Sequence, residues 1–236
     1  MEFTYYGHAC FAVKINNVRV LFDPFITGNP LEAAKKIDVD KIEADYILLS
    51  HGHGDHMLDC ARIAKRTGAL VITNAELSHM LGDGVKAHGM NAGGQANFKD
   101  GKFVYGSGDI KVKCVVAHHS SGLNSGAYGG NPVGFIVYGG DESFYYAGDT
   151  ALTMDMQLIP RWAKLNFAVL PIGDNYTMGV EDALECARMI NCKKVIGVHY
   201  DTFGALIKID HEWAKKVFSE AGYELILLDI GEKINL

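Results

Sequence analysis

The chain has 236 residues, with 28 acidic residues against 22 lysines and arginines, so its formal net charge is −6. Hydrophobic residues make up 48% and charged residues 21%, which excludes an intrinsically disordered chain and is ordinary for a globular protein. The acidic balance argues against broad electrostatic binding to nucleic acid, which needs clustered lysines and arginines. A small anionic substrate is not excluded, because a single pocket can be locally positive.

No repeat, charge run or proline-rich hinge divides the chain, so we expect one domain over residues 1–236. No signal peptide is visible at the start, and the uncharged stretch Cys114–Gly140 is too rich in glycine, serine and asparagine for a membrane span. The five cysteines are never spaced as CxxC, which favours buried thiols in a reducing compartment. We expect a cytoplasmic protein without a membrane partner, and the sequence leaves open whether it forms a homo-oligomer.

The first third predicts an antiparallel meander followed by alternating strands and helices. Asn16-Asn17 is placed for a hairpin turn, Gly68 for a helix end and Asn74 for a helix cap. The predicted strands are Glu2–Tyr6, Cys10–Ile15, Val18–Phe22, Ala44–Leu49 and Ala69–Ile72, and the predicted helices are Met57–Thr67 and Ala75–Leu81. The side chains of the first helix expected to point inward are Leu58, Ala61, Ile63 and Ala64.

The middle is rich in strands, and the last third alternates strand and helix again. The predicted strands are Phe103–Tyr105, Ile110–Ala117, Val133–Tyr138, Ser143–Ala147, Asn166–Pro171, Lys194–Val198 and Tyr223–Asp229, and the predicted helices are Val180–Ile190 and His211–Ala221. Sheet-rich halves with helices outside them predict two sheets packed face to face and covered by helices on both sides.

The segment Ser50-His51-Gly52-His53-Gly54-Asp55-His56 directly follows the predicted strand Ala44–Leu49 and holds four potential metal ligands within six residues. Imidazole and carboxylate together suit zinc or another borderline divalent ion. We expect the two glycine spacers to let the loop curl, because glycine reaches backbone angles closed to other residues. A polar surface loop with coincidental histidines is the alternative, and so dense a cluster favours the metal site.

Three further predicted strands also end in residues of metal-ligand type. They are Ile110–Ala117 with His118-His119, Ser143–Ala147 with Gly148-Asp149, and Lys194–Val198 with His199. Loops at the carboxyl ends of strands gather at one edge in α/β architectures. Separate strand ends that supply histidine, aspartate and histidine would therefore complete the ligand shells of two ions that share a carboxylate and a water.

The motif HxHxDH, followed in chain order by histidine, aspartate and histidine, resembles the metallo-β-lactamase superfamily. Supporting segments are Asp23-Pro24-Phe25, Ala147-Gly148-Asp149-Thr150 and Gly197-Val198-His199-Tyr200. Segments that are similar to small metal-dependent hydrolases related to ascorbate-6-phosphate lactonase are Gly7-His8-Ala9, Pro171-Ile172-Gly173-Asp174-Asn175 and Thr177-Met178-Gly179. The resemblance covers essentially the whole chain and implies an α+β fold, the four-layer αβ/βα sandwich of two similar halves.

The resemblance also implies a ligand set for two divalent metal ions, with zinc first and manganese, iron or nickel as alternatives. The first ion would be held by His51, His53 and His119, the second by Asp55, His56 and His199, and Asp149 would bridge them. We prefer His119 to His118 because His119-Ser120-Ser121 matches the family pattern. His118 is interpreted as a core histidine, because side chains alternate and it shares a strand face with Ile110, Val112, Cys114 and Val116.

Other polar residues have two interpretations each. Asp23 would support the HxHxDH loop by a hydrogen bond or be an ordinary turn residue. His8 would line the site or orient a ligand, or be a satisfied core histidine. Asp174 and Asn175 would touch the substrate or only shape a turn. Expected structural or surface residues are His79, His88 and His211, and expected sheet residues are Tyr5, Tyr6, Tyr145 and Tyr146.

These residues predict a binuclear hydrolase for a small-molecule substrate. Coordination lowers the pKa of a bound water from 15.7 toward about 7 and polarises a scissile carbonyl or phosphoryl group. Asp55 would orient this nucleophile and relay its proton. Lactones, other carboxylic esters and phosphoesters are all substrates that this chemistry can hydrolyse.

The sequence supports four other functions less well. A phosphodiesterase or nuclease of the same superfamily typically has an inserted domain or RNA-binding arm and basic surface, which this acidic chain lacks. A redox di-iron protein would carry a carboxylate at His53, and a glutathione-thioester hydrolase a helical extension where Leu225–Leu236 predicts strand. A metal-binding protein without activity would not need an intact hydrolytic ligand set.

Overall fold

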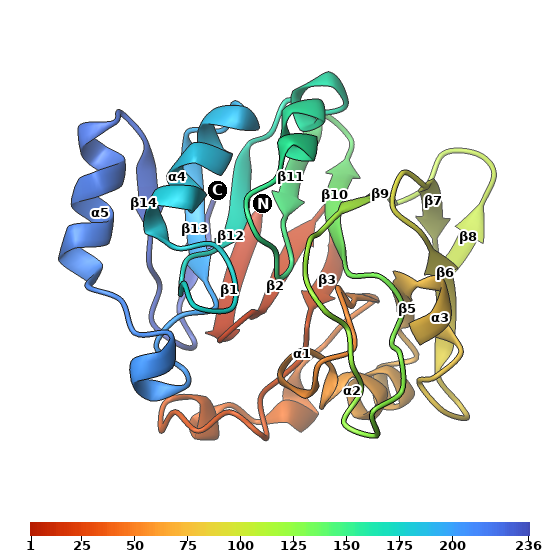
Figure 1. Ribbon diagram of the computed structural model, residues 1–236. Helices are drawn as coiled ribbons and strands as arrows, with labels where there is room; N and C mark the ends of the chain where they lie inside the picture. Colours follow the sequence, from red (N-terminus) through yellow and green to blue (C-terminus); the bar gives the residue numbers. More distant parts are fainter.

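Two mixed β-sheets make up the centre of the computed structural model, which describes residues 1–236 (Figure 1). The seven-stranded sheet has the order β15-β1-β2-β3-β4-β5-β6, and the eight-stranded sheet has the order β14-β13-β12-β11-β10-β9-β7-β8. The strands of the seven-stranded sheet are β1 (Glu2–Gly7), β2 (Cys10–Ile15), β3 (Val18–Phe22), β4 (Tyr46–Leu48), β5 (Leu70–Asn74), β6 (Lys86–Met90) and β15 (Lys233–Asn235).

The second sheet combines strands from the strand-rich middle of the chain with strands from the last third, where strand and helix alternate as expected. Its strands are β7 (Gln95–Lys99), β8 (Lys102–Val104), β9 (Ile110–Val116), β10 (Val133–Gly139), β11 (Glu142–Tyr146), β12 (Phe167–Pro171), β13 (Lys194–Val198) and β14 (Glu224–Ile226). The α-helices are α1 (Gly54–Met57), α2 (Cys60–Thr67), α3 (Ala75–Ser78), α4 (Val180–Met189) and α5 (His211–Glu220). Short 3-10 segments are η1 (Ala34–Lys36), η2 (Val39–Lys41), η3 (Met154–Arg161) and η4 (Gly204–Leu206).

Alternation along the strands separates three apolar cores. On β3, Val20 and Phe22 face the core between the sheets, whereas Leu21 faces the opposite side. On β10, Phe135 faces the inter-sheet core and Ile136 the outer one. The outer faces are covered by α2 and α3 on one sheet and by α4, α5 and η3 on the other (Figure 1). The predicted four-layer sandwich is therefore confirmed.

Aromatic rings fill much of the layer between the sheets. The Phe11 ring stacks on Phe3 and on Phe22, with centroids 4.9 and 4.4 Å apart. Phe144 stacks on Phe167 at 4.8 Å, and all five rings are fully buried. Burial of such large apolar surfaces is the main force that holds the two sheets together.

The strands that precede the candidate ligands end at a common edge. In one sheet β3 runs parallel to β4, and in the other β11, β12 and β13 are parallel. β9 and β11 are both antiparallel to β10, so β9 ends on the same side as β11. The loops after these strands therefore meet at one edge of the sandwich, where parallel sheets form their sites.

The local turn signals are confirmed. Asn16 and Asn17 have φ of 49° and 65°, as a two-residue hairpin turn with both central residues at positive φ requires. Gly68 ends α2 in the left-handed conformation, with φ of 74°. The Asn74 side chain accepts a hydrogen bond from the backbone N–H of Leu77 and so caps α3.

The helix expected over Met57–Thr67 is interrupted near its start, at Leu58 and Asp59. Two helices, α1 and α2, occupy this region and are separated at Asp59. The Asp59 carboxylate accepts hydrogen bonds from the backbone N–H groups of Ile26 (2.7 Å) and Thr27 (2.9 Å), which ties this point of the chain to the loop after β3. Leu58, expected to point inward, is half-exposed because it lies in this interruption.

Strands at or next to the sheet edges were the least predictable. Strands β6 and β7 were not expected, because both are short and polar. His88, expected as a structural or surface residue, lies in β6. The strand expected over Tyr223–Asp229 is shortened to β14, after which the chain turns and β15 pairs with β1 in the other sheet. None of the helices has the length and apolarity that a membrane crossing requires.

The inter-sheet core gives a prediction about stability. Phe167→Ala removes a fully buried ring between the sheets and should lower the free energy of unfolding by about 3–5 kcal/mol. Tyr105→Ala is the matched control, because Tyr105 is 97% exposed, and it should change this free energy by less than about 0.5 kcal/mol. Equilibrium denaturation in urea measures both. Equal effects of the two substitutions would contradict the proposed role of the aromatic layer.

Candidate metal centre

The loop after β4 and the short helix α1 bring four candidate ligands to the edge of the sandwich. His51 is fully buried, His53 immediately precedes α1, and Asp55 and His56 lie within α1. The turn of helix directs the Asp55 and His56 side chains to one region and leaves His51 and His53 in another. One continuous segment therefore contributes to two separate groups of ligands.

The two glycine spacers act through close packing. Neither Gly52 nor Gly54 has a positive φ, so the expectation that they supply unusual backbone angles is wrong. A Cβ atom at Gly52 would lie 2.9 Å from Leu123, and one at Gly54 would lie 3.0 Å from the Asn124 side chain. The glycines let the loop that contains Leu123 and Asn124 approach the motif. Gly148, with φ of 64°, supplies the unusual angle instead, directly before Asp149.

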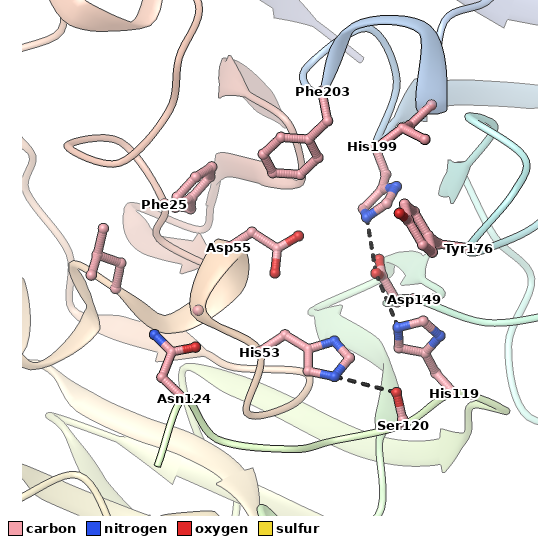
Figure 2. Close-up of a pocket in the computed structure, with 13 residues that line it drawn as sticks. Phe25, His53, Asp55, His119, Ser120, Asn124, Asp149, Tyr176, His199 and Phe203 are labelled. Carbon is pink, nitrogen blue, oxygen red and sulfur yellow. Dashed lines mark hydrogen bonds and ion pairs between the residues drawn. The ribbon is translucent and has the colours of Figure 1, made fainter. Parts of the chain in front are cut away.

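His51, His53 and His119 form the first group, with candidate ligand atoms within 4.8 Å of one another. His51 Nε2 lies 2.9 Å from His53 Nδ1, and His119 follows β9 on the facing loop (Figure 2). Ser50 Oγ lies 2.9 Å from His51 Nδ1 and fixes the ring. Burial lowers the pKa of all three histidines, so they are neutral at pH 7, as metal ligands must be.

Asp55, His56 and His199 form the second group together with His8, again within 4.8 Å. His199 follows β13, so this group joins residues of both sheets. Burial would lower the pKa of His56, but the carboxylates of Asp149 and Asp23 raise it well above its usual value. A metal ion at His56 Nε2 would therefore replace a proton.

One oxygen of Asp149 faces both groups. Asp149 Oδ2 lies 3.0 Å from Nε2 of His199, 3.2 Å from that of His56 and 3.5 Å from that of His119. Figure 2 shows Asp149 between His119 and His199. Burial would raise the pKa of the Asp149 carboxyl, but His199 and His56 hold it well below its usual value. This buried group is therefore ionised at neutral pH.

The donors fit divalent metal ions. Three buried atoms of the site make no hydrogen bond, namely Asp149 Oδ1, His199 Nδ1 and His56 Nε2, whose contact with Asp149 Oδ2 is an ion pair without hydrogen-bond geometry. Unpaired buried polar atoms are costly unless something else satisfies them. A set of imidazole nitrogens and carboxylate oxygens without sulfur suits zinc and the other first-row divalent ions.

Asp23 lies beneath the motif and contacts it directly. Its carboxylate accepts hydrogen bonds from the Ser50 N–H (2.7 Å) and the Tyr146 hydroxyl (2.6 Å), and lies 2.8 Å from His56 Nδ1. Asp23 is fully buried, so these contacts fit a supporting role better than that of an ordinary turn residue. Tyr146, expected only as a sheet residue, extends from β11 to reach this carboxylate.

His8 is held between two polar partners. Its Nε2 lies 3.1 Å from Asp55 Oδ2 and its Nδ1 lies 3.0 Å from Thr202 Oγ1. Burial lowers the pKa of His8 to about 4, so the ring is neutral. The ionised Asp55 carboxylate can only accept a hydrogen bond, so the neutral ring carries its proton on Nε2. Nδ1 then accepts from the Thr202 hydroxyl, whose other acceptor is the Tyr200 carbonyl at 3.2 Å. Since both ring nitrogens have partners, the contacts fit a residue that orients Asp55.

The backbone is strained where the two sheets meet at the site. His8 and His199 have φ of 54° and 57°, in the left-handed region, and the His199 N–H donates to the His8 carbonyl at 2.9 Å. Such conformations are unfavourable for residues with a side chain and concentrate at functional sites. The strain fixes the two rings 4.2 Å apart, between centroids.

Two expectations about individual residues need correction or refinement. His118 is not a core histidine: its side chain is 60% exposed and lies 3.8 Å from Asp155. The inward alternation of β9 breaks because Val116 is already exposed. Asp174 and Asn175 are also exposed and adopt positive φ, which fits the turn interpretation. Like His118, the residues His79, His88 and His211 lie outside both groups.

A cavity of about 740 Å³ opens over the two groups (Figure 2). Besides Gly54 and the candidate ligands His53, Asp55, His119, Asp149 and His199, it is lined by Phe25, Leu58, Ser120, Asn124, Tyr176, Phe203 and Leu206. Sequence reasoning included Phe25 and Ser120 in its motifs and missed the other five as cavity residues. They come from separate loops, and each one alone looks like any other apolar or polar loop residue.

The fold and the two ligand groups define a class of metal-dependent hydrolase. The family model described as "Beta-lactamase superfamily domain" matches residues 18–200. A relative from Christiangramia forsetii, named "UPF0173 metal-dependent hydrolase", is 52% identical over 237 residues and covers 100% of both chains. The chain belongs to this family of metal-dependent hydrolases within the metallo-β-lactamase superfamily.

Solved structures agree with this assignment. Igni18, a metallo hydrolase from Ignicoccus hospitalis, superposes with a TM-score of 0.85 at 30% identity and covers 99% of this chain and 97% of its own. An isothiocyanate hydrolase from Delia radicum gut bacteria has a TM-score of 0.76 at 18% identity, over 100% of this chain and 99% of its own. At 18% identity, the comparison with the isothiocyanate hydrolase shows that the two proteins share a fold.

The neighbouring histidines after β9 give a matched test of the first group. His119→Ala should lower the metal content and abolish hydrolysis, because His119 lies with His51 and His53. His118→Ala should leave both unchanged, because His118 is exposed and points away. Elemental analysis of the purified variants, with turnover, measures this. Loss of metal in His118→Ala with retention in His119→Ala would reverse the assignment.

Proposed function

We propose that this protein hydrolyses a small ester, lactone or phosphoester at two divalent metal ions that share Asp149. Zinc is the first candidate for these ions. The observation that carries the proposal is the position of Asp149 Oδ2, within 3.5 Å of imidazole nitrogens from both ligand groups. A shared carboxylate offsets the repulsion between two cations about 3.5–4 Å apart. His51, His53 and His119 would hold one ion, and Asp55, His56 and His199 the other.

The chain's own residues would arrange the reacting groups. When bound, the ions supply a water of lowered pKa and polarise the bond to be cleaved. Asp55 lines the cavity next to the ligand groups. Burial would raise the pKa of its carboxyl, but the hydrogen bond from His8 and the nearby His56 lower it. The ionised Asp55 can orient the attacking water and help to pass its proton to the leaving group.

Hydrolysis is favoured over di-iron redox chemistry by the residue at position 53. His53 completes a group of three histidines with His51 and His119, whereas the redox alternative has a carboxylate there. The nuclease alternative gains no support from the cavity, because no lysine or arginine lines it.

Substitution of the shared carboxylate tests the binuclear proposal. Asp149→Ala should lower the metal content of both groups together and reduce hydrolysis to background. Asp149→Asn keeps the shape but removes the charge, so it should also bind metal poorly. His199→Ala should weaken chiefly the second group and leave nearer one metal ion per chain. Elemental analysis and turnover are measured after circular dichroism has shown that each variant is folded.

The control is the wild-type protein, which should carry up to two ions per chain. A folded Asp149→Ala variant that retains two ions and full activity would contradict the shared carboxylate. Wild-type protein that binds no metal under any loading condition would contradict the proposal as a whole.

His8 gives a separate prediction about Asp55. His8→Ala should lower kcat about 10–100-fold while metal content stays near that of wild type, because the hydrogen bond that orients Asp55 is lost. His8→Gln should recover part of the rate, since its amide can still donate to Asp55. Steady-state kinetics and elemental analysis distinguish the two roles. Loss of one ion per chain in His8→Ala would show that His8 is a ligand.

A further inference from the structure

The walls of the cavity carry no positive charge of their own. Among its lining residues none is lysine or arginine, and the only carboxylates are Asp55 and Asp149. Both carboxylates belong to the ligand groups. A phosphate or carboxylate on the part of a substrate that extends away from the metal ions would therefore enter the cavity without a cation to pair with, which is unfavourable.

Aromatic rings form the wall next to Asp55. Phe25 and Phe203 lie 6.4 Å apart, between centroids, and pack against the His8 ring at 5.7 and 5.2 Å. His8 in turn contacts Asp55 at 3.1 Å. Figure 2 shows both phenylalanines beside Asp55. The apolar surface therefore begins immediately beside the proposed catalytic carboxylate.

Large, partly exposed apolar side chains also line the cavity. Leu58, Tyr176 and Leu206 line it and are 50%, 52% and 56% exposed. They come from the α1–α2 junction, the turn after β12 and η4. Exposed apolar residues that gather around a concave site mark a ligand-binding surface.

The packing of this wall depends on a glycine. A Cβ atom at Gly28 would lie 2.6 Å from both the Leu58 and the Phe25 side chains. The absence of a side chain at position 28 therefore lets these two residues sit close together. On the other side of the cavity, near His53, the lining residues Ser120 and Asn124 offer uncharged hydrogen-bonding groups (Figure 2).

We propose that the substrate is a carboxylic ester or lactone whose acyl part is uncharged and apolar, and that this wall selects it over phosphorylated or carboxylated compounds. The inference rests on the proposed hydrolytic function and narrows its substrate class. The ester carbonyl that water attacks would lie at the ligand groups, with the alcohol as the leaving group, and the acyl chain would lie along Phe25, Phe203 and Leu206. A sugar phosphate is disfavoured, because its phosphate would meet this uncharged wall.

A pair of esters that differ in one group tests the selection. The zinc-loaded full-length protein is assayed with 4-nitrophenyl pentanoate and with mono-(4-nitrophenyl) glutarate, in which a carboxylate replaces the terminal methyl group. We expect kcat/KM to be at least about tenfold higher for the pentanoate. From the acetate to the hexanoate, KM should fall about two- to fourfold for each added methylene group. 4-Nitrophenyl phosphate should be a poor substrate.

Variants at the mouth test the wall itself. Leu206→Arg places a cation at an exposed position of the rim and should raise kcat/KM for the glutarate several-fold while lowering it for the pentanoate. Leu206→Gln is the uncharged control and should lower only the pentanoate value. Leu158→Arg adds the same charge on η3, outside the cavity, and should change neither value.

Binding without turnover separates this inference from the proposed function. Pentanohydroxamic acid and glutaric acid monohydroxamate are titrated calorimetrically into the zinc-loaded protein. Tighter binding of the pentano compound, with no hydrolysis of any ester, would support the apolar wall and contradict the hydrolytic proposal. If the protein hydrolyses the esters with a kcat/KM for the glutarate equal to or higher than that for the pentanoate, the inference is overturned and the hydrolytic proposal still stands.

Discussion

The buried carboxylate of Asp149 is the interaction on which the site depends. An ionised group in the interior is costly unless opposite charge or donors surround it. Here the imidazoles of His56, His119 and His199 converge on it from α1 and from the loops after β9 and β13. His56 follows a strand of one sheet and the other three residues follow strands of the second. The site can therefore form only when the aromatic layer has packed the two sheets together.

Around this centre, further polar contacts hold the candidate ligands in place. Asp23 at the end of β3 orients His56 and the motif loop, and His8 between β1 and β2 orients Asp55. His8, Asp23 and His199 all lie in the left-handed region, with φ between 39° and 57°. Strained backbone that is shared by supporting residues and candidate ligands indicates a site whose geometry is stabilised by the rest of the fold, as a preorganised catalytic site requires.

The fold and the proximity of the candidate ligands could be predicted because their signals are local. The HxHxDH segment and the polar residues after β9, β11 and β13 are visible in short stretches, and the rule that strand ends share an edge joins them. The cavity wall could not be predicted, because Leu58, Tyr176 and Leu206 come from three loops whose proximity exists only after folding. A glycine such as Gly52 is visible in the sequence, but whether it serves backbone angle or close packing is a property of its distant neighbours.

X-ray absorption spectroscopy of the fully zinc-loaded protein tests the shared carboxylate most directly. The account predicts a zinc–zinc distance of about 3.5–4 Å and a ligand shell of nitrogen and oxygen. No zinc–sulfur contribution near ~2.3 Å is expected, because all five cysteines are buried and none belongs to the ligand groups. A spectrum at full loading without a zinc–zinc vector, or with sulfur ligands, would contradict the account.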